Sequence, residues 1–219
     1  MKKHLPLIAS VLTACAVPAM AGTFDGLQAS VGVHQSQARL RGGEVFDNTG
    51  TDLGYATSEA SRSRTGLQLG LAYGLSSGDW QTNVGVDYRD THHELRADDG
   101  QGNTYGLDVT RRVDVYVAPG YALDRHSVVY AKLGYSHLTL DNAFNAASGG
   151  LSGGPGTHAV IYGVGFKQKI GDNTSPLFYA VEYTTGTTAS GALVDASGNS
   201  SDSRLKLSTV GVSLGYLFN

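Results

Sequence analysis

The sequence contains little cysteine, little charge and no long apolar run in its body. One cysteine among 219 residues excludes an intramolecular disulfide framework. Charged residues make up 16%, against roughly 25% in an average soluble domain. The formal net charge is −3, which argues against a nucleic-acid-binding protein held by a basic face. Beyond residue 21 no run reaches 18 apolar residues, which excludes a membrane-spanning helix.

The residues that are abundant are glycine and tyrosine, with 30 and 12 copies. The first 21 residues do not belong to this pattern, because they have the composition of an export signal. Lys2 and Lys3 give a basic start, an apolar stretch follows, and Ala19-Met20-Ala21 supplies the small residues that signal peptidase requires. We predict a signal peptide over 1–21, cleavage after Ala21 and a mature domain over 22–219.

A second interpretation of the same segment stays open. Leu12-Thr13-Ala14-Cys15 fits the lipobox of bacterial lipoproteins, in which Cys15 is acylated after cleavage. That interpretation leaves an apolar core of only about seven residues and no role for the Ala-Met-Ala site. Cleavage after Ala21 instead leaves a mature chain without cysteine, which suits export through an oxidising compartment.

Apolar and polar residues alternate with a period of two through the whole mature chain, which indicates β-strands. No segment has an apolar stripe at helical spacing. Eight alternating segments can be delimited. They lie near 24–40, 60–75, 80–91, 104–123, 128–140, 158–170, 177–187 and 203–219.

The connections between these segments alternate strictly between long and short. Short turns lie at 76–79, 124–127 and 171–176, and long polar connections near 41–59, 91–103, 141–157 and 188–202. Short periplasmic turns and long extracellular loops are typical of outer-membrane barrels. We therefore predict an all-β fold, an eight-stranded antiparallel up-and-down transmembrane β-barrel. The composition of the outer loops predicts that they lack the apolar surface to order themselves.

A soluble β-sandwich would show the same alternation. Two features favour the membrane. The face opposite the apolar one consists of glycine and polar residues, as the lumen of a narrow barrel requires. Aromatic residues of the apolar face gather near strand ends, as in the belts at bilayer interfaces. One predicted belt contains Tyr73, Trp80, Tyr121, Tyr179, Tyr216 and Phe218, and the other Tyr88, Tyr135, Tyr162 and Tyr183.

The last segment resembles the C-terminal signal by which the barrel-assembly machinery recognises outer-membrane proteins. The residues that form it share one face, and Asn219 follows the terminal aromatic, a modest departure. They are Val210, Val212, Leu214, Tyr216 and Phe218. The stretches 117–123 and 130–136 look like the small outer-membrane β-barrel family that includes the OmpA transmembrane domain, OmpX, attachment-invasion and opacity-type proteins. The resemblance implies architecture more than activity.

Parity predicts a set of charged side chains inside the barrel. They are Arg62, Arg64, Asp87, Arg89, Asp108, Arg112, Asp114, Lys132, Lys167, Lys169 and Glu182. The interior of an eight-stranded barrel is just wide enough for side chains to fill. Opposite charges there should pair, because an unpaired buried ion costs several kcal/mol. The central network is expected to contain Asp87, Arg89, Arg112, Asp114, Lys132, Lys167 and Glu182.

This network has two interpretations: a salt-bridged structural plug, or a narrow path that favours anions because bases outnumber acids. Arg111 has lipid-facing parity just above the hydrocarbon level. It is a candidate for contact with lipopolysaccharide phosphates, or it simply snorkels to the interface.

Catalysis and metal binding have weaker support. Some small barrels modify lipid A, yet Ser136-His137 and His126-Ser127 lack the spacing that the deacylase motif requires. His92-His93-Glu94 is a metal candidate, but adjacent residues on an extended chain point apart. We predict no cofactor, no metal and no catalytic residue.

The sequence thus favours a monomeric, non-enzymatic protein of the cell outer membrane, with roles in envelope integrity or adhesion. Expected partners are outer-membrane lipid and lipopolysaccharide, the assembly machinery and a surface ligand at the loops, but no nucleic acid. A small-solute porin and a lipid A-modifying enzyme remain as alternatives.

Overall fold

The structure is a computed structural model that describes residues 24–41, 43–47, 49–56, 59–98, 104–141, 157–172, 174–188, 193–194, 200–201 and 204–218. The predicted signal peptide, its cleavage site and Cys15 lie outside the described residues, so they stay predictions.

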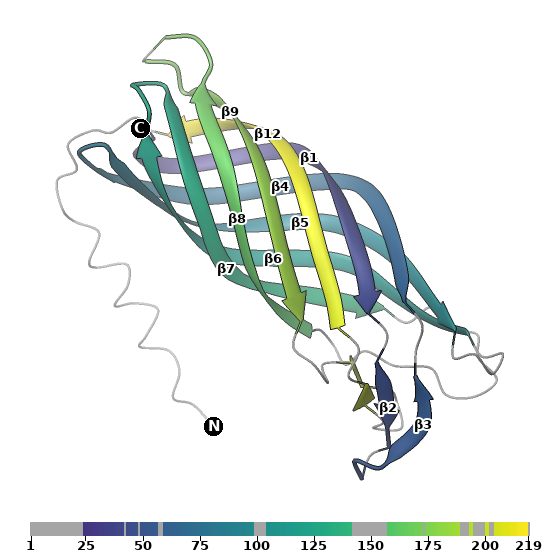
Figure 1. The fold of residues 1–219 in the computed structure, drawn as a ribbon. Coiled ribbons are helices and arrows are strands. Elements are labelled where there is room, and N and C mark those ends of the chain that lie inside the picture. The colour runs from purple at the N-terminus through teal and green to yellow at the C-terminus, as the bar shows by residue number, and fades with distance from the viewer. Residues whose placement is uncertain are drawn as a thin grey trace, which may run out of the picture.

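Eight long strands close into one antiparallel barrel (Figure 1). They are β1 (Gly26–Arg41), β4 (Ala60–Ser77), β5 (Trp80–Asp98), β6 (Thr104–Ala122), β7 (Ser127–Asp141), β8 (Thr157–Lys169), β9 (Leu177–Thr188) and β12 (Arg204–Phe218). Their order around the barrel is β1-β12-β9-β8-β7-β6-β5-β4. The first and last strands close it, in register from Leu27 opposite Phe218 to Arg41 opposite Arg204. The predicted fold class is confirmed, and seven of the eight strands lie within two residues of their predicted bounds. The exception is β5, which was predicted to end at residue 91 and continues to Asp98, so the first half of the predicted loop over 91–103 is strand.

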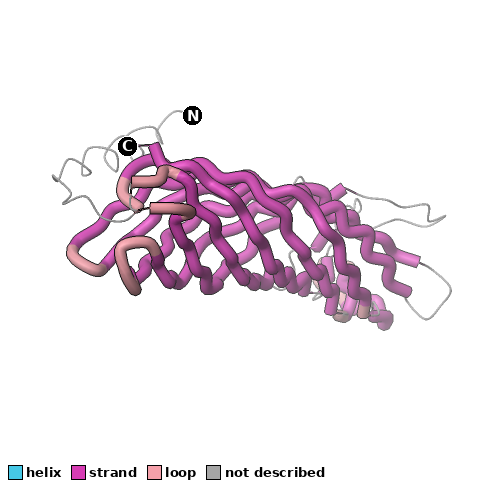
Figure 2. The backbone as a smooth tube through the Cα atoms, turned by 90° about the horizontal axis from the view of Figure 1, so that it is seen from above, coloured by secondary structure: helices cyan, strands magenta, loops and turns pink. Residues whose placement is uncertain are grey.

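Short turns join the strands at the end of the barrel where β12 finishes (Figure 2). Gly78 and Gly171 have φ of 61° and 97°, a backbone conformation that side chains disfavour. In the β6–β7 turn, the Asp124 carboxylate accepts a hydrogen bond from the His126 amide at 2.7 Å. That bond lowers the pKa of the Asp124 carboxyl below its usual value.

At the opposite end four short strands form a second sheet, in the order β10-β11-β2-β3 (Figure 1). They are β2 (Glu44–Phe46), β3 (Asp52–Ala56), β10 (Leu193–Val194) and β11 (Ser200–Ser201). For the described parts of the loops at 41–59 and 188–202, the expectation that the loops lack order of their own is therefore wrong. Residues 99–103 and 142–156, in the other two loops, lie outside the described residues. Backbone pairing supplies the order, and the Asp47 carboxylate fixes the β2–β3 turn by accepting bonds from the Thr49 and Thr51 amides, each at 2.8 Å.

The outer wall of the barrel is apolar. Leu67, Trp80 and Val164 are 63%, 64% and 60% exposed, so these side chains face away from the lumen without covering protein. The predicted belt residues Tyr73, Tyr121, Tyr216 and Phe218 are also exposed, as are all four of the other belt. An apolar surface of this extent, bounded by aromatic residues, fits a hydrocarbon environment.

The described residues include no helix long and apolar enough to cross a membrane.

Two irregularities interrupt the strand pairing near the end of the barrel that carries the second sheet. One lies in β5 between Asp90 and His93, and the other, a β-bulge, in β6 between Val109 and Arg111. His92, within the first, has a positive φ of 34°. In β6 the extra residue changes the inward and outward parity beyond it, whereas in β5 buried and exposed residues keep alternating through the irregularity.

The ladder between β4 and β5 covers only part of their length. It runs from Ser77 opposite Trp80 to Gln68 opposite Arg89. Beyond that point β4 continues to Ala60 paired with β1, and β5 continues to Asp98 paired with β6. Among the described residues, these two strand edges therefore have no mutual pairing, and the barrel wall has a seam there.

Candidate functional site

The lumen of the barrel contains an ion-pair network that joins strands on all sides. Its cations are Arg89 and Arg112, both 1% exposed, and Lys132, 2% exposed. Its anions are Asp87, Asp114 and Glu182. Three cations face three anions, so this group is electrically balanced. Each member sits at an inward position because strand residues alternate between the two faces.

Arg89 on β5 is the centre of the network. Its guanidinium contacts Asp114, lies 3.2 Å from Asp87 and lies 2.8 Å from Glu182. Its Nε donates to the Gln68 side chain at 3.0 Å. All three nitrogens of the planar guanidinium thus have partners, an arrangement that the single nitrogen of an ammonium group cannot reproduce.

Lys132 on β7 connects Asp87 and Glu182, two of the carboxylates that also contact Arg89. Its Nζ donates to Asp87 at 2.5 Å and to both Glu182 oxygens at 2.9 Å. The same ammonium lies 3.7 Å from the centroid of the Tyr116 ring, a cation–π contact. The Tyr130 hydroxyl donates to Glu182 at 3.2 Å, which adds a neutral donor to the cluster.

Arg112 on β6 extends the network toward the closing strand. Its Nε donates to Asp114 at 2.8 Å and its Nη1 donates to the Thr209 hydroxyl of β12 at 3.1 Å. Removing one member of such a buried group leaves an uncompensated charge, which is the costly case for ion pairs away from water.

Lys167 was expected in this network but lies apart from the ion pairs just described. Its ammonium donates to the Gln28 side chain at 2.5 Å. It also faces three aromatic rings, with centroid distances of 5.3 Å to Phe24, 5.1 Å to Phe178 and 5.8 Å to Tyr130. Aromatic faces take the place of carboxylates around this cation.

The end of the lumen beside the short turns is filled by apolar side chains. Phe24, Val128 and Phe178 are at most 3% exposed and form one cluster. The Phe24 and Phe178 rings meet edge to face at 5.6 Å. Two side-chain amides, of Gln28 and Gln81, donate to the Phe24 carbonyl at 2.6 and 3.0 Å and hold this residue in the opening.

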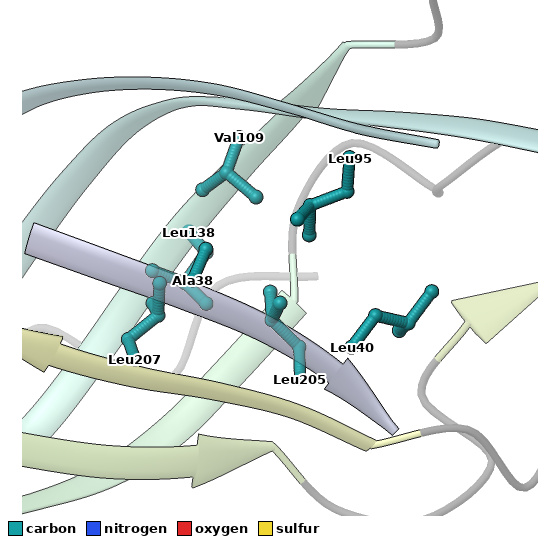
Figure 3. Close-up of a cluster of buried hydrophobic side chains, with 7 residues drawn as sticks. All are labelled: Ala38, Leu40, Leu95, Val109, Leu138, Leu205 and Leu207. Atoms are coloured by element: carbon teal, nitrogen blue, oxygen red, sulfur yellow. The ribbon is translucent and has the colours of Figure 1, made fainter. Parts of the chain in front are cut away.

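A second apolar cluster fills the lumen beyond the ion pairs. Figure 3 shows its side chains directed toward one another from β1, β5, β6, β7 and β12. Its members are Ala38, Leu40, Leu95, Val109, Leu138, Leu205 and Leu207, each at most 4% exposed. The expectation of a uniformly polar lumen is therefore wrong. The interior has three levels: apolar, ionic and apolar again.

One cavity lies among the side chains of the lumen. It has a volume of about 40 Å³ accessible to water and lies beside Asp87, Tyr116 and Lys167. Such a volume holds a few water molecules at most.

Three other charged residues predicted inside occupy different places. Asp108 lies beyond the β6 bulge and pairs with Glu94, whose side chain is exposed, so the bulge has moved it to the outer face. Arg62 and Arg64 pair with Ala38 and Ser36, which are inward and buried, yet both arginines are exposed. The seam beside β4 explains this exposure.

Lys169 and Arg111 lie on β8 and β6. The Lys169 ammonium is 5.9 Å from the Phe24 ring, at the end of the lumen beside the short turns. Arg111 is exposed on the outer wall and pairs in register with Asp90, so a carboxylate lies on the neighbouring strand.

The residues predicted as the assembly signal form one continuous outward stripe on β12. All five are 44–58% exposed, and they are Val210, Val212, Leu214, Tyr216 and Phe218.

The serine–histidine neighbours singled out in the sequence do not form dyads. Ser136 is buried in the lumen and His137 points outward, where its ring packs against His158 at 4.8 Å. A different pair does meet: the Ser36 hydroxyl lies 2.7 Å from His93 Nε2. Sequence reasoning missed it because 57 residues separate the two. Both side chains are at most 1% exposed, which leaves no access for a substrate.

The metal candidate is also divided between two faces. His93 is buried inside, whereas His92 and Glu94 are exposed. Within the described part of the chain, no group of three or more His, Cys, Asp or Glu side chains is placed to hold a metal ion.

Comparison with known proteins identifies the class to which this barrel belongs. Residues 7–218 match the model of the outer membrane protein beta-barrel domain family. The chain is a member of that family, and its localisation is the outer membrane. No curated protein sequence matches the chain.

Solved structures of outer-membrane proteins align with the chain at low sequence identity. The outer membrane protein OprG from Pseudomonas aeruginosa aligns with a TM-score of 0.50 and 12% identity, over 90% of this chain and 98% of that one. Ail, the attachment invasion locus protein of Yersinia pestis, in complex with the heparin analogue sucrose octasulfate, gives 0.41 and 14%, over 87% and 99%. The outer membrane protease OmpT from Escherichia coli gives 0.40 and 10%, over 92% and 99%.

Proposed function

We propose that the chain is a closed, non-enzymatic outer-membrane scaffold that acts at its extracellular end, in envelope integrity or adhesion. The observation that supports this most directly is the blocked lumen. Phe24 and Phe178 fill one end, balanced ion pairs cross the middle, and the leucine-rich cluster fills the other end. A path for solutes would have to displace all three levels.

The wall and the extracellular sheet agree with such a role. The β10-β11-β2-β3 sheet is built from the two loops that flank the closing strands, and it holds these loops in a defined shape. Loops on a rigid scaffold are where binding functions usually reside. We further propose a monomer, assembly through the Val210–Phe218 stripe, and outer-leaflet lipid as the partner of the wall.

Planar-bilayer recording of the refolded barrel tests the closed lumen, with a general porin as a positive control. We expect no steady conductance. A steady conductance that Lys132→Ala abolishes would show instead that the ammonium lines a path, and would favour the narrow, anion-favouring pore. Swelling of liposomes in small sugars gives the same comparison without an applied voltage.

Mass spectrometry of lipid A tests the absence of enzymatic activity. Lipid A from cells with and without the gene should have the same acyl chains and phosphates. A difference that Ser36→Ala removes would overturn the proposal, since Ser36 and His93 form the serine–histidine contact described above.

A further inference from the structure

The extracellular ends of the two closing strands carry a compact group of positive charges on the outer wall. In the β1–β12 register, Arg39 lies directly opposite Lys206 and Arg41 directly opposite Arg204. All four side chains are exposed. We call these four residues the closing-strand basic patch.

Like charges placed directly across a ladder destabilise the pair of strands that carry them. This patch contains two such pairs in succession. Arg39 makes a salt bridge to Glu59 at 3.2 Å, with both side chains more than half exposed. Among the described residues, this is the one salt bridge that the four cations make, so an anion of high charge density would relieve the remaining repulsion.

The height of the patch on the wall indicates what that anion is. Along β12 the outward residues run from Phe218 through Val210, which pairs with Tyr183 of the outer aromatic belt. Lys206 lies four residues further on. At about 3.3 Å per residue and a strand tilt near 40°, this is roughly 10 Å beyond the belt. Phosphorylated sugars of outer-leaflet glycolipids occupy that layer.

The patch is also held in place from both sides. Below it, the β1–β12 ladder is continuous from Leu27 and Phe218 onward. Above it, the same two chain segments pair again, with β2 Phe46 opposite β11 Ser200. A ligand therefore meets cations whose backbone is already ordered, which reduces the entropy lost on binding.

Arg111, the residue suggested by the sequence, is less suited to the same ligand. It lies on β6, on the far side of the barrel order from β1 and β12. Its partner across the ladder is Asp90, so a carboxylate competes for its guanidinium. In the closing-strand basic patch, by contrast, the residue directly across the ladder from each cation is another cation.

We propose that the closing-strand basic patch is a binding site for the phosphorylated saccharide headgroup of an outer-leaflet glycolipid. Guanidinium groups bind phosphate oxygens in pairs, and Arg39, Arg41 and Arg204 supply three of them beside the Lys206 ammonium. The site rests on the outer-membrane placement of the barrel but not on its closed lumen, so a conducting barrel would leave this proposal intact.

The test uses the refolded full-length barrel in a neutral detergent and purified bisphosphorylated lipid A as the probe. Binding is measured by native mass spectrometry and by the rise in the thermal midpoint of unfolding. The variant Arg204→Gln/Lys206→Gln is compared with Arg96→Gln/Arg125→Gln, which removes the same charge at distant exposed positions. We expect the first pair to weaken binding roughly 30-fold, at about 1 kcal/mol per basic residue, and the control pair to change it little.

A second measurement separates loss of the site from misfolding. Without lipid A, Arg204→Gln/Lys206→Gln should unfold at a higher temperature than the parent, because the like-charge pairs are gone. The parent should bind dephosphorylated lipid A at least tenfold more weakly than the bisphosphorylated form.

Three results would overturn the proposal. They are equal binding of both lipids by the parent, unchanged binding by the patch variant, and an equal loss in the control pair. Binding of heparin, a soluble polyanion, is measured in parallel. A patch variant that keeps lipid A binding but loses heparin binding gives the second of these results and assigns the patch to a soluble polyanion.

Discussion

Arg89 on β5 and Glu182 on β9 form an ion pair of 2.8 Å across the full width of the lumen. The two strands are four places apart in the barrel order in either direction, so they are diametrically opposite. A contact between opposite walls narrows the lumen at that level. It also ties together strands that share no backbone hydrogen bonds.

The first prediction concerns this contact. Glu182→Gln should lower the free energy of unfolding by about 3–5 kcal/mol, because Arg89 and Lys132 both lose their shared carboxylate inside the lumen. Urea unfolding of the refolded barrel, followed by electrophoresis with and without boiling, measures the change. Tyr130→Phe is the matched control, since it removes one hydrogen bond from a neutral donor to the same carboxylate and should cost about 1.5 kcal/mol. Equal effects of the two variants would contradict the charge argument.

The second prediction concerns close packing at the end of the lumen beside the short turns. A Cβ added at Gly215 would lie 2.1 Å from the Phe178 ring, so Gly215→Ala must displace that ring from the apolar cluster. We expect a loss of about 1–3 kcal/mol, and partial recovery when Phe178→Leu is added. Gly211→Ala serves as the comparison. There the nearest atom is the end of the flexible Gln68 side chain at 3.0 Å, and the cost should stay below about 1 kcal/mol.

The third prediction concerns the seam between β4 and β5. Beyond Gln68, β4 pairs only with β1 among the described residues. Successive amides of a strand point to alternate sides, so about every second amide between residues 60 and 67 should exchange rapidly with deuterium. Amides between residues 69 and 75 should be protected on both sides. Hydrogen exchange resolved by residue checks this, and uniform protection along β4 would show that the seam is closed.

The fourth prediction concerns the position of the barrel in the bilayer. Trp80 is the single tryptophan, is 64% exposed and packs edge to face on Tyr121 at 5.6 Å next to the short turns. Its fluorescence should be quenched more by lipids brominated close to the headgroup than by lipids brominated at the chain ends. Trp80→Phe/Tyr73→Trp keeps a single tryptophan on the neighbouring strand, where Tyr73 lies opposite Val84, and should move the strongest quenching deeper. Stronger quenching of Trp80 by the deep bromines would place the apolar band elsewhere on the wall.

The sequence determined the number of barrel strands, the approximate ends of all but β5 and which face of most strands is apolar, because these depend on a local period of two and on turn residues. It did not predict the four short strands of the second sheet. It also placed Asp87, Arg89, Arg112, Asp114, Lys132 and Glu182 inside, since parity holds along an uninterrupted strand. Parity failed beyond a bulge, where Asp108 moved outward and Val109 inward.

Only the tertiary structure decided which charges meet and which lie together on the wall. The lateral register of antiparallel strands, and the shear that closes eight of them into a barrel, set Arg89 opposite Glu182 and Arg41 opposite Arg204. That register depends on side-chain packing summed around the whole barrel. For the same reason the sequence could not show that Lys167 lies against aromatic rings instead of the carboxylates expected for it. The local sequence pattern shows which face of the strand each residue occupies. The residues that it meets on other strands are set only when the eight strands close into the barrel.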